Sequence, residues 1–174
     1  MIRVIDLSRS GKLTAAIIDP DTFRKTCSRF ATGIAIATVT DADGAPFGLT
    51  INSFTSVSCS PPLVLICVDF RCNILSHFRS APYYGINVLS EAQRELSVRF
   101  SQPQGDRFAD IGWSQGITGV PLLQGSLACM ECCVTQTVDA GDHVVLLAEV
   151  IYARYAEGDP LLYYRSRYGA LSSK

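Results

Sequence analysis

The feature that most restricts the fold of this chain is a series of extended apolar and β-branched runs separated by turns rather than by helices. Asp41-Ala42-Asp43-Gly44 and Asp139-Ala140-Gly141-Asp142 have the composition of hairpin turns. Because strands outnumber helices and no β-α-β alternation occurs, we expect a mainly β fold, an antiparallel β-barrel with a few peripheral helices. The predicted strands cover residues 34–40, 47–58, 63–69, 83–89, 127–138, 143–155 and 161–164.

A short amphipathic helix is predicted before the first strand. The pair Asp19-Pro20 has the composition of an N-cap and a first helical position, and Phe23, Cys27 and Phe30 recur at helical spacing.

Two further helices and a long connection are expected. Residues 73–79 form a short helix capped by Asn73, and residues 91–100 form another. Residues 101–125 contain five glycines and two prolines, which indicates a long, partly ordered excursion over the surface.

Length and composition indicate one globular domain. The 174 residues suffice for one core, and 48% hydrophobic against 18% charged residues exclude a disordered chain. A net charge of −1 gives no electrostatic footprint for nucleic acid or an anionic membrane, so neither partner is expected. We divide the chain into an N-terminal extension, residues 1–18, and a domain, residues 19–174.

Neither a membrane anchor nor a disulfide framework is expected. The longest purely apolar stretch, residues 63–68, is far shorter than the ~20 residues of a membrane span, and the first eighteen residues lack the apolar centre of a secretory signal. A cytoplasmic chain whose seven cysteines are reduced is therefore expected. Cys129, Cys132 and Cys133 lie in an extended run where positions three apart face opposite ways, so no metal site is predicted.

The most informative polar cluster interrupts a run that should otherwise be an apolar strand. Nucleotide-binding glycine motifs, a nucleophile elbow and a zinc-protease motif are absent from the sequence. One reading of the cluster is a solvated strand face with an irregular turn. Against it, adjacent Asn52 and Ser53 break the alternation, which predicts a kink that presents amides and hydroxyls to a planar heteroaromatic ligand. The polar members are Thr50, Asn52, Ser53, Thr55, Ser56 and Ser58, interleaved with Ile51, Phe54 and Val57.

These residues resemble the signature of the short flavin reductase family, which has the FMN-binding split-barrel fold. The resemblance spans residues 20–171 and rests on blocks that share the family's order and spacing. The blocks are Gly48-Leu49-Thr50-Ile51-Asn52-Ser53-Phe54-Thr55-Ser56-Val57-Ser58 with Pro61-Pro62-Leu63, Gly85-Ile86-Asn87-Val88-Leu89 with Gln93, Phe100, Asp106-Arg107-Phe108, Gly141-Asp142-His143, and Pro160-Leu161-Leu162-Tyr163-Tyr164 with Tyr168-Gly169.

The resemblance implies a split β-barrel enzyme that uses NADH or NADPH to reduce FMN or FAD by hydride transfer. Members of the family commonly supply reduced flavin to a partner monooxygenase, and they form homodimers with flavin between the subunits. Two alternatives stay open. One is a reductase whose retained flavin passes electrons to another acceptor, such as a corrinoid or a metal complex, and the other is a non-catalytic flavin-binding module.

The resemblance also implies roles for individual residues. His143 would lie near the nicotinamide as the catalytic residue, although a turn-capping histidine is the structural alternative. Arg107 would meet a pyrophosphate or an interface carboxylate, and Tyr168 would stack on a ring or hydrogen-bond to it. The remaining cofactor-binding residues are Thr50, Asn52, Ser53 and Phe54 at the isoalloxazine and ribityl chain, Ser56 and Ser58 nearby, Asp69, Phe70, Arg71, Cys72 and Asn73 at the phosphate, and Phe100 and Ser101 beside the flavin.

Overall fold

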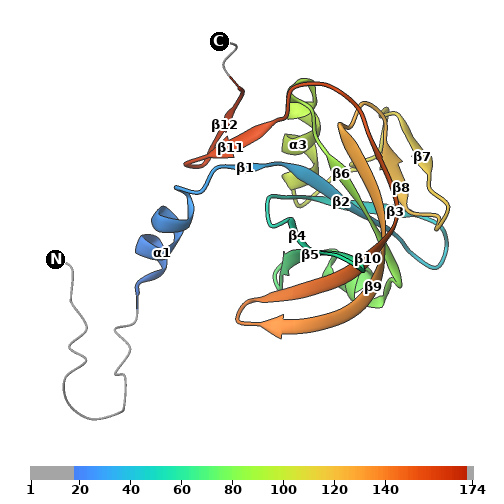
Figure 1. Ribbon diagram of the computed structural model, residues 1–174, viewed down its shortest axis with the longest axis horizontal. Helices are drawn as coiled ribbons and strands as arrows, with labels where there is room; N and C mark the ends of the chain where they lie inside the picture. The colour runs from blue at the N-terminus through green and yellow to red at the C-terminus, as the bar shows by residue number, and fades with distance from the viewer. Residues whose placement is uncertain (1–17, 172–174) are drawn as a thin grey trace.

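The computed structural model describes residues 18–171, and its centre is one curled antiparallel sheet of seven strands (Figure 1). The spatial order is β3-β2-β6-β9-β10-β5-β4, and every neighbouring pair is antiparallel. The outermost strands β3 and β4 do not pair, so the barrel is split and the predicted fold class is confirmed. The strands are β2 (Ala35–Thr40), β3 (Pro46–Ile51), β4 (Thr55–Cys59), β5 (Pro62–Asp69), β6 (Tyr83–Val88), β9 (Ala128–Ala140) and β10 (His143–Tyr155).

The split falls in the run 47–58, which was predicted as one extended segment. The run is two strands, because β3 ends at Ile51 and β4 begins at Thr55. Between them, residues 52–54 lead from one edge of the sheet to the other, and we call them the crossing segment. The kink predicted at Asn52 and Ser53 is thus present, while the prediction of a single strand is wrong.

The barrel interior is built from alternate residues of the strands. In β5, Val64, Ile66 and Val68 are buried, whereas the residues between them are half-buried and face outward. The same alternation in β10 places Val144 and Leu146 inside. This period of two is the pattern of a sheet with one face on the core.

The helices differ from the predictions in two details. Helix α1 (Pro20–Cys27) is capped by Asp19, whose carboxylate accepts hydrogen bonds from the backbone of Asp21 and Thr22, but it ends before Phe30 and buries no residue. Helix α2 (Leu75–Ser80) is not capped by Asn73, because it begins two residues later.

The segment predicted as helix 91–100 is a short 3₁₀ turn, η1 (Glu91–Gln93), followed by α3 (Arg94–Ser101). Ser90 and Gln93 form a reciprocal capping box at its start, and the Gln93 amide also donates to the Gln124 carbonyl.

The excursion at residues 101–125 is more ordered than predicted. It contains the hairpin of β7 (Trp113–Gln115) and β8 (Pro121–Leu123), held by polar side chains that are fully buried. The Glu131 carboxylate accepts hydrogen bonds from the backbone N–H groups of Ile117 and Thr118, and the Asn87 side chain accepts one from Leu123. Asn87, a member of the family-like blocks, therefore fastens this hairpin to the barrel.

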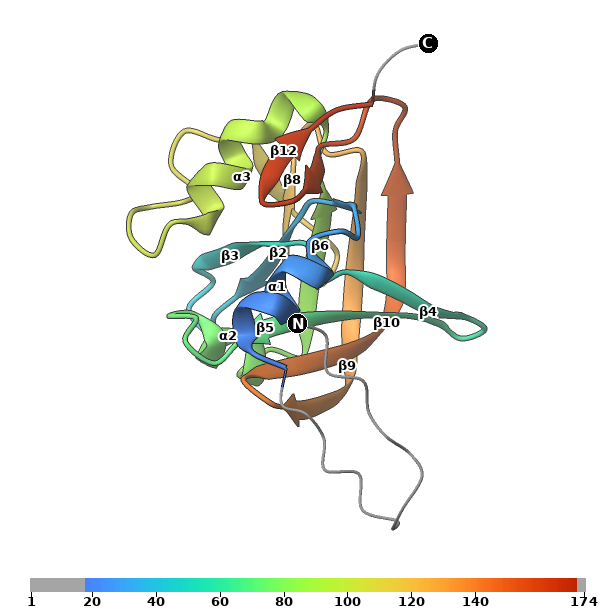
Figure 2. The ribbon, with the colours of Figure 1, turned by 90° about the vertical axis from the view of Figure 1, so that its left-hand side faces the viewer.

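A separate three-stranded sheet stands beside the barrel. It has the order β1-β11-β12, with β1 (Thr32–Gly33), β11 (Leu162–Tyr164) and β12 (Arg167–Gly169). Together with α1 it projects from the side of the barrel opposite to β7 (Figures 1 and 2).

All seven cysteines are free thiols. Cys129 and Cys132 are both buried but belong to different apolar clusters, as expected for positions three apart in a strand. Within residues 18–171 no three potential ligands gather to hold a metal ion, and no helix is long and apolar enough to cross a membrane. The predicted N-terminal extension lies almost entirely outside the described residues.

Candidate functional site

The crossing segment is held by one side chain. The Ser53 hydroxyl donates to the Cys67 carbonyl and accepts from the Cys67 N–H, at 3.0 Å in each case. It thereby continues the β4–β5 ladder, in which Thr55 pairs with Leu65, to a point two positions before the start of β4. Beside it Asn52 is exposed, and its amide makes no hydrogen bond to any residue between 18 and 171. The segment therefore offers a fixed backbone and one free amide.

A first cavity opens where β3 meets the crossing segment. It has a volume of about 250 Å³, and we call it the hydroxyl pocket. It brings together four residues predicted for the site, which come from β3, the crossing segment, α3 and β12. The lining residues are Ile34, Thr50, Ile51, Asn52, Ser97, Ser101, Tyr163 and Tyr168.

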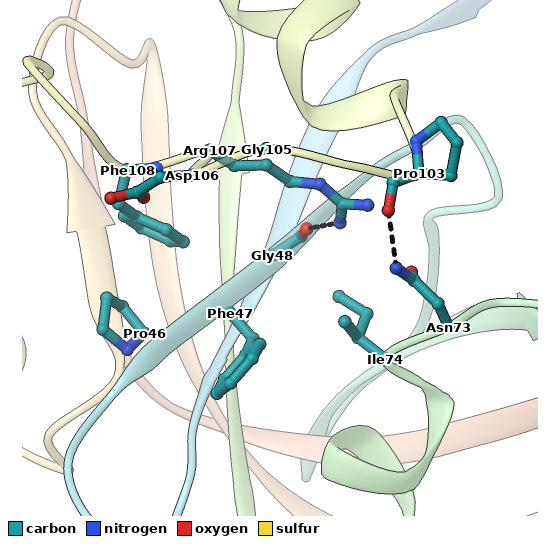
Figure 3. A pocket seen from close by; sticks show the side chains of 10 residues that line it. All are labelled: Pro46, Phe47, Gly48, Asn73, Ile74, Pro103, Gly105, Asp106, Arg107 and Phe108. Carbon is teal, nitrogen blue, oxygen red and sulfur yellow. Dashed lines mark hydrogen bonds between the residues drawn. The ribbon is translucent and has the colours of Figure 1, made fainter.

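A second cavity, of about 240 Å³, lies toward the other end of β3, and we call it the arginine pocket (Figure 3). Arg107 points across it and donates to the carbonyls of Gly48 and Gln102. Burial lowers the pKa of the Arg107 guanidinium from its ordinary value, and no carboxylate of the described residues pairs with it. The Asn73 amide donates to the Pro103 carbonyl and ties the loop over this cavity to the start of α2.

Phe100 lies beneath β3 and outside both cavities. It is 1% exposed and packs edge-on against Phe108 with 5.0 Å between ring centroids. A Cβ at Gly48 would lie only 2.8 Å from its ring, so the glycine permits β3 to pass directly over the aromatic side chain.

The predicted phosphate loop forms a charged rim at the end of β5. The Arg71 guanidinium lies 2.7 Å from Asp69 Oδ2 and donates a second bond to Oδ1. These bonds from Arg71 hold the pKa of the Asp69 carboxyl well below its usual value. Across the β5–β10 ladder Asp69 pairs with His143, whose Nδ1 lies 2.7 Å from Asp142 Oδ1. That bond lowers the pKa of Asp142.

The structure does not bring the other predicted residues into either cavity. Phe54 and Cys72 are partly buried against the main core. Ser56 is exposed on β4, Ser58 accepts a hydrogen bond from the Ser60 N–H, and Phe70 is exposed below the Arg79 guanidinium.

Two hydroxyl-bearing residues that line the hydroxyl pocket were missed by the sequence analysis. Tyr163 belongs to a quoted block but was given no role, and Ser97 lies on the buried side of α3. The sequence offers one signal for Ser97, which is a polar side chain on the side of the helix that faces the core.

Comparison with known proteins identifies the family. The flavin reductase like domain matches residues 27–172. The chain belongs to this family. A probable flavin reductase of Rhizobium meliloti (strain 1021) is 41% identical over 138 residues, which are 79% of this chain and 44% of that protein. The chain thus spans less than half of that relative.

Two further relatives match over most of their own length. The flavin-dependent monooxygenase reductase subunit HsaB of Rhodococcus jostii (strain RHA1) is 36% identical over 164 residues, 94% of this chain and 84% of that protein. The NADH:FAD oxidoreductase SgcE6 of Streptomyces globisporus, solved with NAD and FAD fragments, superposes with a TM-score of 0.83 at 33% identity, covering 91% of this chain and 98% of that one.

The residues of this flavin reductase domain fit a flavin nucleotide. An isoalloxazine ring requires hydrogen-bonding groups along one edge and an apolar wall, and the hydroxyl pocket is lined by the exposed Asn52 amide together with Ile34 and Ile51. Its phosphate requires a cation, and Arg107 is a guanidinium that no carboxylate of the described residues neutralises. Arg71, by contrast, is already paired with Asp69.

Ser53→Ala and Asn52→Ala are expected to differ in stability. Loss of the Ser53 hydroxyl leaves both the N–H and the carbonyl of Cys67 without their partner, which lowers the free energy of unfolding by about 1–3 kcal/mol. The exposed Asn52 side chain contributes less than about 0.5 kcal/mol. Urea unfolding of the two variants measures this, and equal midpoints would show that Ser53 does not hold the crossing segment.

Proposed function

We propose that this chain is an NAD(P)H-dependent flavin reductase that transfers hydride from a nicotinamide nucleotide to FMN or FAD and supplies reduced flavin to a monooxygenase. The observation that carries the proposal is the crossing segment, whose Asn52 amide lines the hydroxyl pocket at one end of β3, while Arg107, which has no carboxylate partner among the described residues, lies in the arginine pocket toward the other end. The proposal is supported by family membership and by relatives named as monooxygenase reductase subunits.

In this proposal, residues of the chain bind and orient the isoalloxazine ring of the flavin and the nicotinamide ring of the second nucleotide. The Asn52 amide and the backbone of residues 52–54 bond the edge of the flavin, while Thr50 and Ser101 lie at one end and Arg107 holds the phosphate at the other. When bound, the flavin accepts hydride from the nicotinamide C4 at its N5, so no protein acid or base has to act in that step. The protein accelerates it by stacking the rings at about 3–3.5 Å.

His143 is assigned to the nicotinamide nucleotide. It lies on the outward face of β10, two residues before Val145. Val145 pairs with Cys67, the residue whose backbone is bonded to the Ser53 hydroxyl, so His143 lies near the crossing segment. The bond between Nδ1 and Asp142 leaves Nε2 as the nitrogen free for a ligand. Asp69, directly across the ladder, keeps a negative charge beside it.

Anaerobic rapid mixing of the protein with NADH or NADPH and with FMN or FAD tests the proposal. We expect the absorbance of oxidised flavin near its visible maximum to disappear in a reaction that requires the protein. Flavin that is lost on gel filtration before the assay indicates a diffusible substrate. Flavin that is retained would favour the alternative of a bound group that reduces another acceptor, and binding without reduction would identify a non-catalytic module.

His143→Ala is expected to raise KM for NAD(P)H or lower kcat by roughly tenfold, the effect of one lost hydrogen bond to a charged or strongly polar group. Flavin affinity, measured by fluorescence titration, should change less than twofold because the flavin contacts the crossing segment. If NAD(P)H turnover and flavin affinity were lowered equally, His143 would instead have only a structural role in the β9–β10 turn.

We also propose that two copies of the chain associate. Helix α1 is only eight residues long and buries none of them. Phe23, within the helix, is 59% exposed, and Phe30, three residues after its end, is 78% exposed. Isolated helices of this length are marginal in water, so a covering surface is required. A second copy of the chain is the partner that supplies one, and the seven free thiols support a cytoplasmic location for this homodimer.

Phe23→Ser should shift the protein from dimer toward monomer in sedimentation equilibrium. The matched control is Ile117→Ser, because Ile117 is 76% exposed but lies in the β7–β8 turn, on the other side of the barrel from α1 (Figure 1). A dimer that both variants leave unchanged, or a wild-type protein that is monomeric at all concentrations, would contradict the assignment.

A further inference from the structure

The hydroxyl pocket contains a hydrogen bond between α3 and the C-terminal hairpin. Ser97 Oγ lies 3.0 Å from the Tyr168 phenolic oxygen, and either atom has the geometry to donate. Ser97 is fully buried, and its backbone carbonyl accepts a 2.7 Å bond from Thr50 Oγ1. Strand β3, helix α3 and strand β12 therefore meet at this one serine.

The surroundings decide which oxygen donates. If Tyr168 donated to Ser97, the serine proton would point into a fully buried site in which no other acceptor of the described residues bonds to it. Such an orphaned donor is costly. If Ser97 donates, both the buried proton and the phenolic lone pair are satisfied. The phenolic proton then faces the cavity that Tyr168 lines.

The Tyr168 ring is held from two further directions. The Arg94 guanidinium lies over one face, with its central carbon 5.1 Å from the ring centroid. Tyr163 packs against the ring edge-on, at 5.7 Å between centroids and 67° between planes. A ring fixed by a cation, by an aromatic neighbour and by its own hydroxyl has little freedom left, so its O–H direction is set before any ligand binds.

We propose that Ser97 is a positioning residue that aims the Tyr168 O–H into the hydroxyl pocket, where it donates to a carbonyl oxygen on a bound planar ring. Both ring ligands of the proposed reductase carry such an oxygen, the flavin on its pyrimidine portion and the nicotinamide on its carboxamide. This inference rests on the proposed function, and it adds an orientation-determining bond at the end of the site away from Arg107.

Tyr168→Phe tests the bond and keeps the ring packing. Loss of one ligand hydrogen bond is expected to weaken binding roughly three- to tenfold. A higher Kd in a flavin titration without nicotinamide assigns the carbonyl to the flavin. An unchanged flavin Kd with a higher KM for NAD(P)H assigns it to the nicotinamide. Unchanged values in both assays overturn the inference. The control Tyr164→Phe removes a hydroxyl from a 45% exposed tyrosine of the same hairpin and should change neither.

Ser97→Ala tests the positioning role. It should weaken the same ligand as Tyr168→Phe, and in the Tyr168→Phe background it should have no further effect, because Ser97 acts through the phenol. A serine that served only the fold would lower Tm in both backgrounds and leave ligand affinity unchanged. Wild-type protein that binds neither flavin nor NAD(P)H would refute the proposed function and this inference together, whereas normal wild-type binding with unaffected variants would refute the inference alone.

Discussion

The unpaired edges of the seven-stranded sheet are the constraint on which the site depends. Strands β3 and β4 face a split, and the chain has to cross it without a complete ladder. Buried backbone groups need partners, and the Ser53 hydroxyl supplies one donor and one acceptor to Cys67 where a main-chain neighbour would otherwise stand. The adjacent Asn52 is exposed and makes no side-chain hydrogen bond to residues 18–171, and its amide is the group that we propose for the ligand.

Much of this arrangement could be predicted from the sequence because its signals are local. The Asp41 turn, the Asp19 cap and the broken alternation at Asn52-Ser53 each depend on neighbours in the chain, and each is present in the structure. The residues whose placement could not be predicted depend on distant partners. Asn73 bonds Pro103 rather than capping a helix, because the loop over the arginine pocket folds back to it.

Residue type alone also could not separate site residues from structural ones. Arg71 and Arg107 are both candidate phosphate or pyrophosphate ligands in the sequence, yet Asp69 neutralises the first, while the second donates to two carbonyls and pairs with no carboxylate of residues 18–171. Asn87 and Asn52 are likewise both asparagines of family-like blocks. The first is fully buried with its oxygen bonded to Leu123, and the second is exposed and free. Burial and partners, which tertiary structure determines, decide the role.

The covering of β3 further limits how a ligand approaches. An edge strand with bare N–H and carbonyl groups invites pairing with another strand. Here the Gly48 carbonyl accepts a hydrogen bond from Arg107, and the Thr50 hydroxyl ties β3 to the Ser97 carbonyl of α3, so side chains cover part of this edge. In the site that we propose, a planar ring at the Asn52 end of β3 would meet the hydroxyl pocket and the crossing segment, and an anionic tail would be the group that reaches Arg107. That combination of ring and phosphate describes a nucleotide.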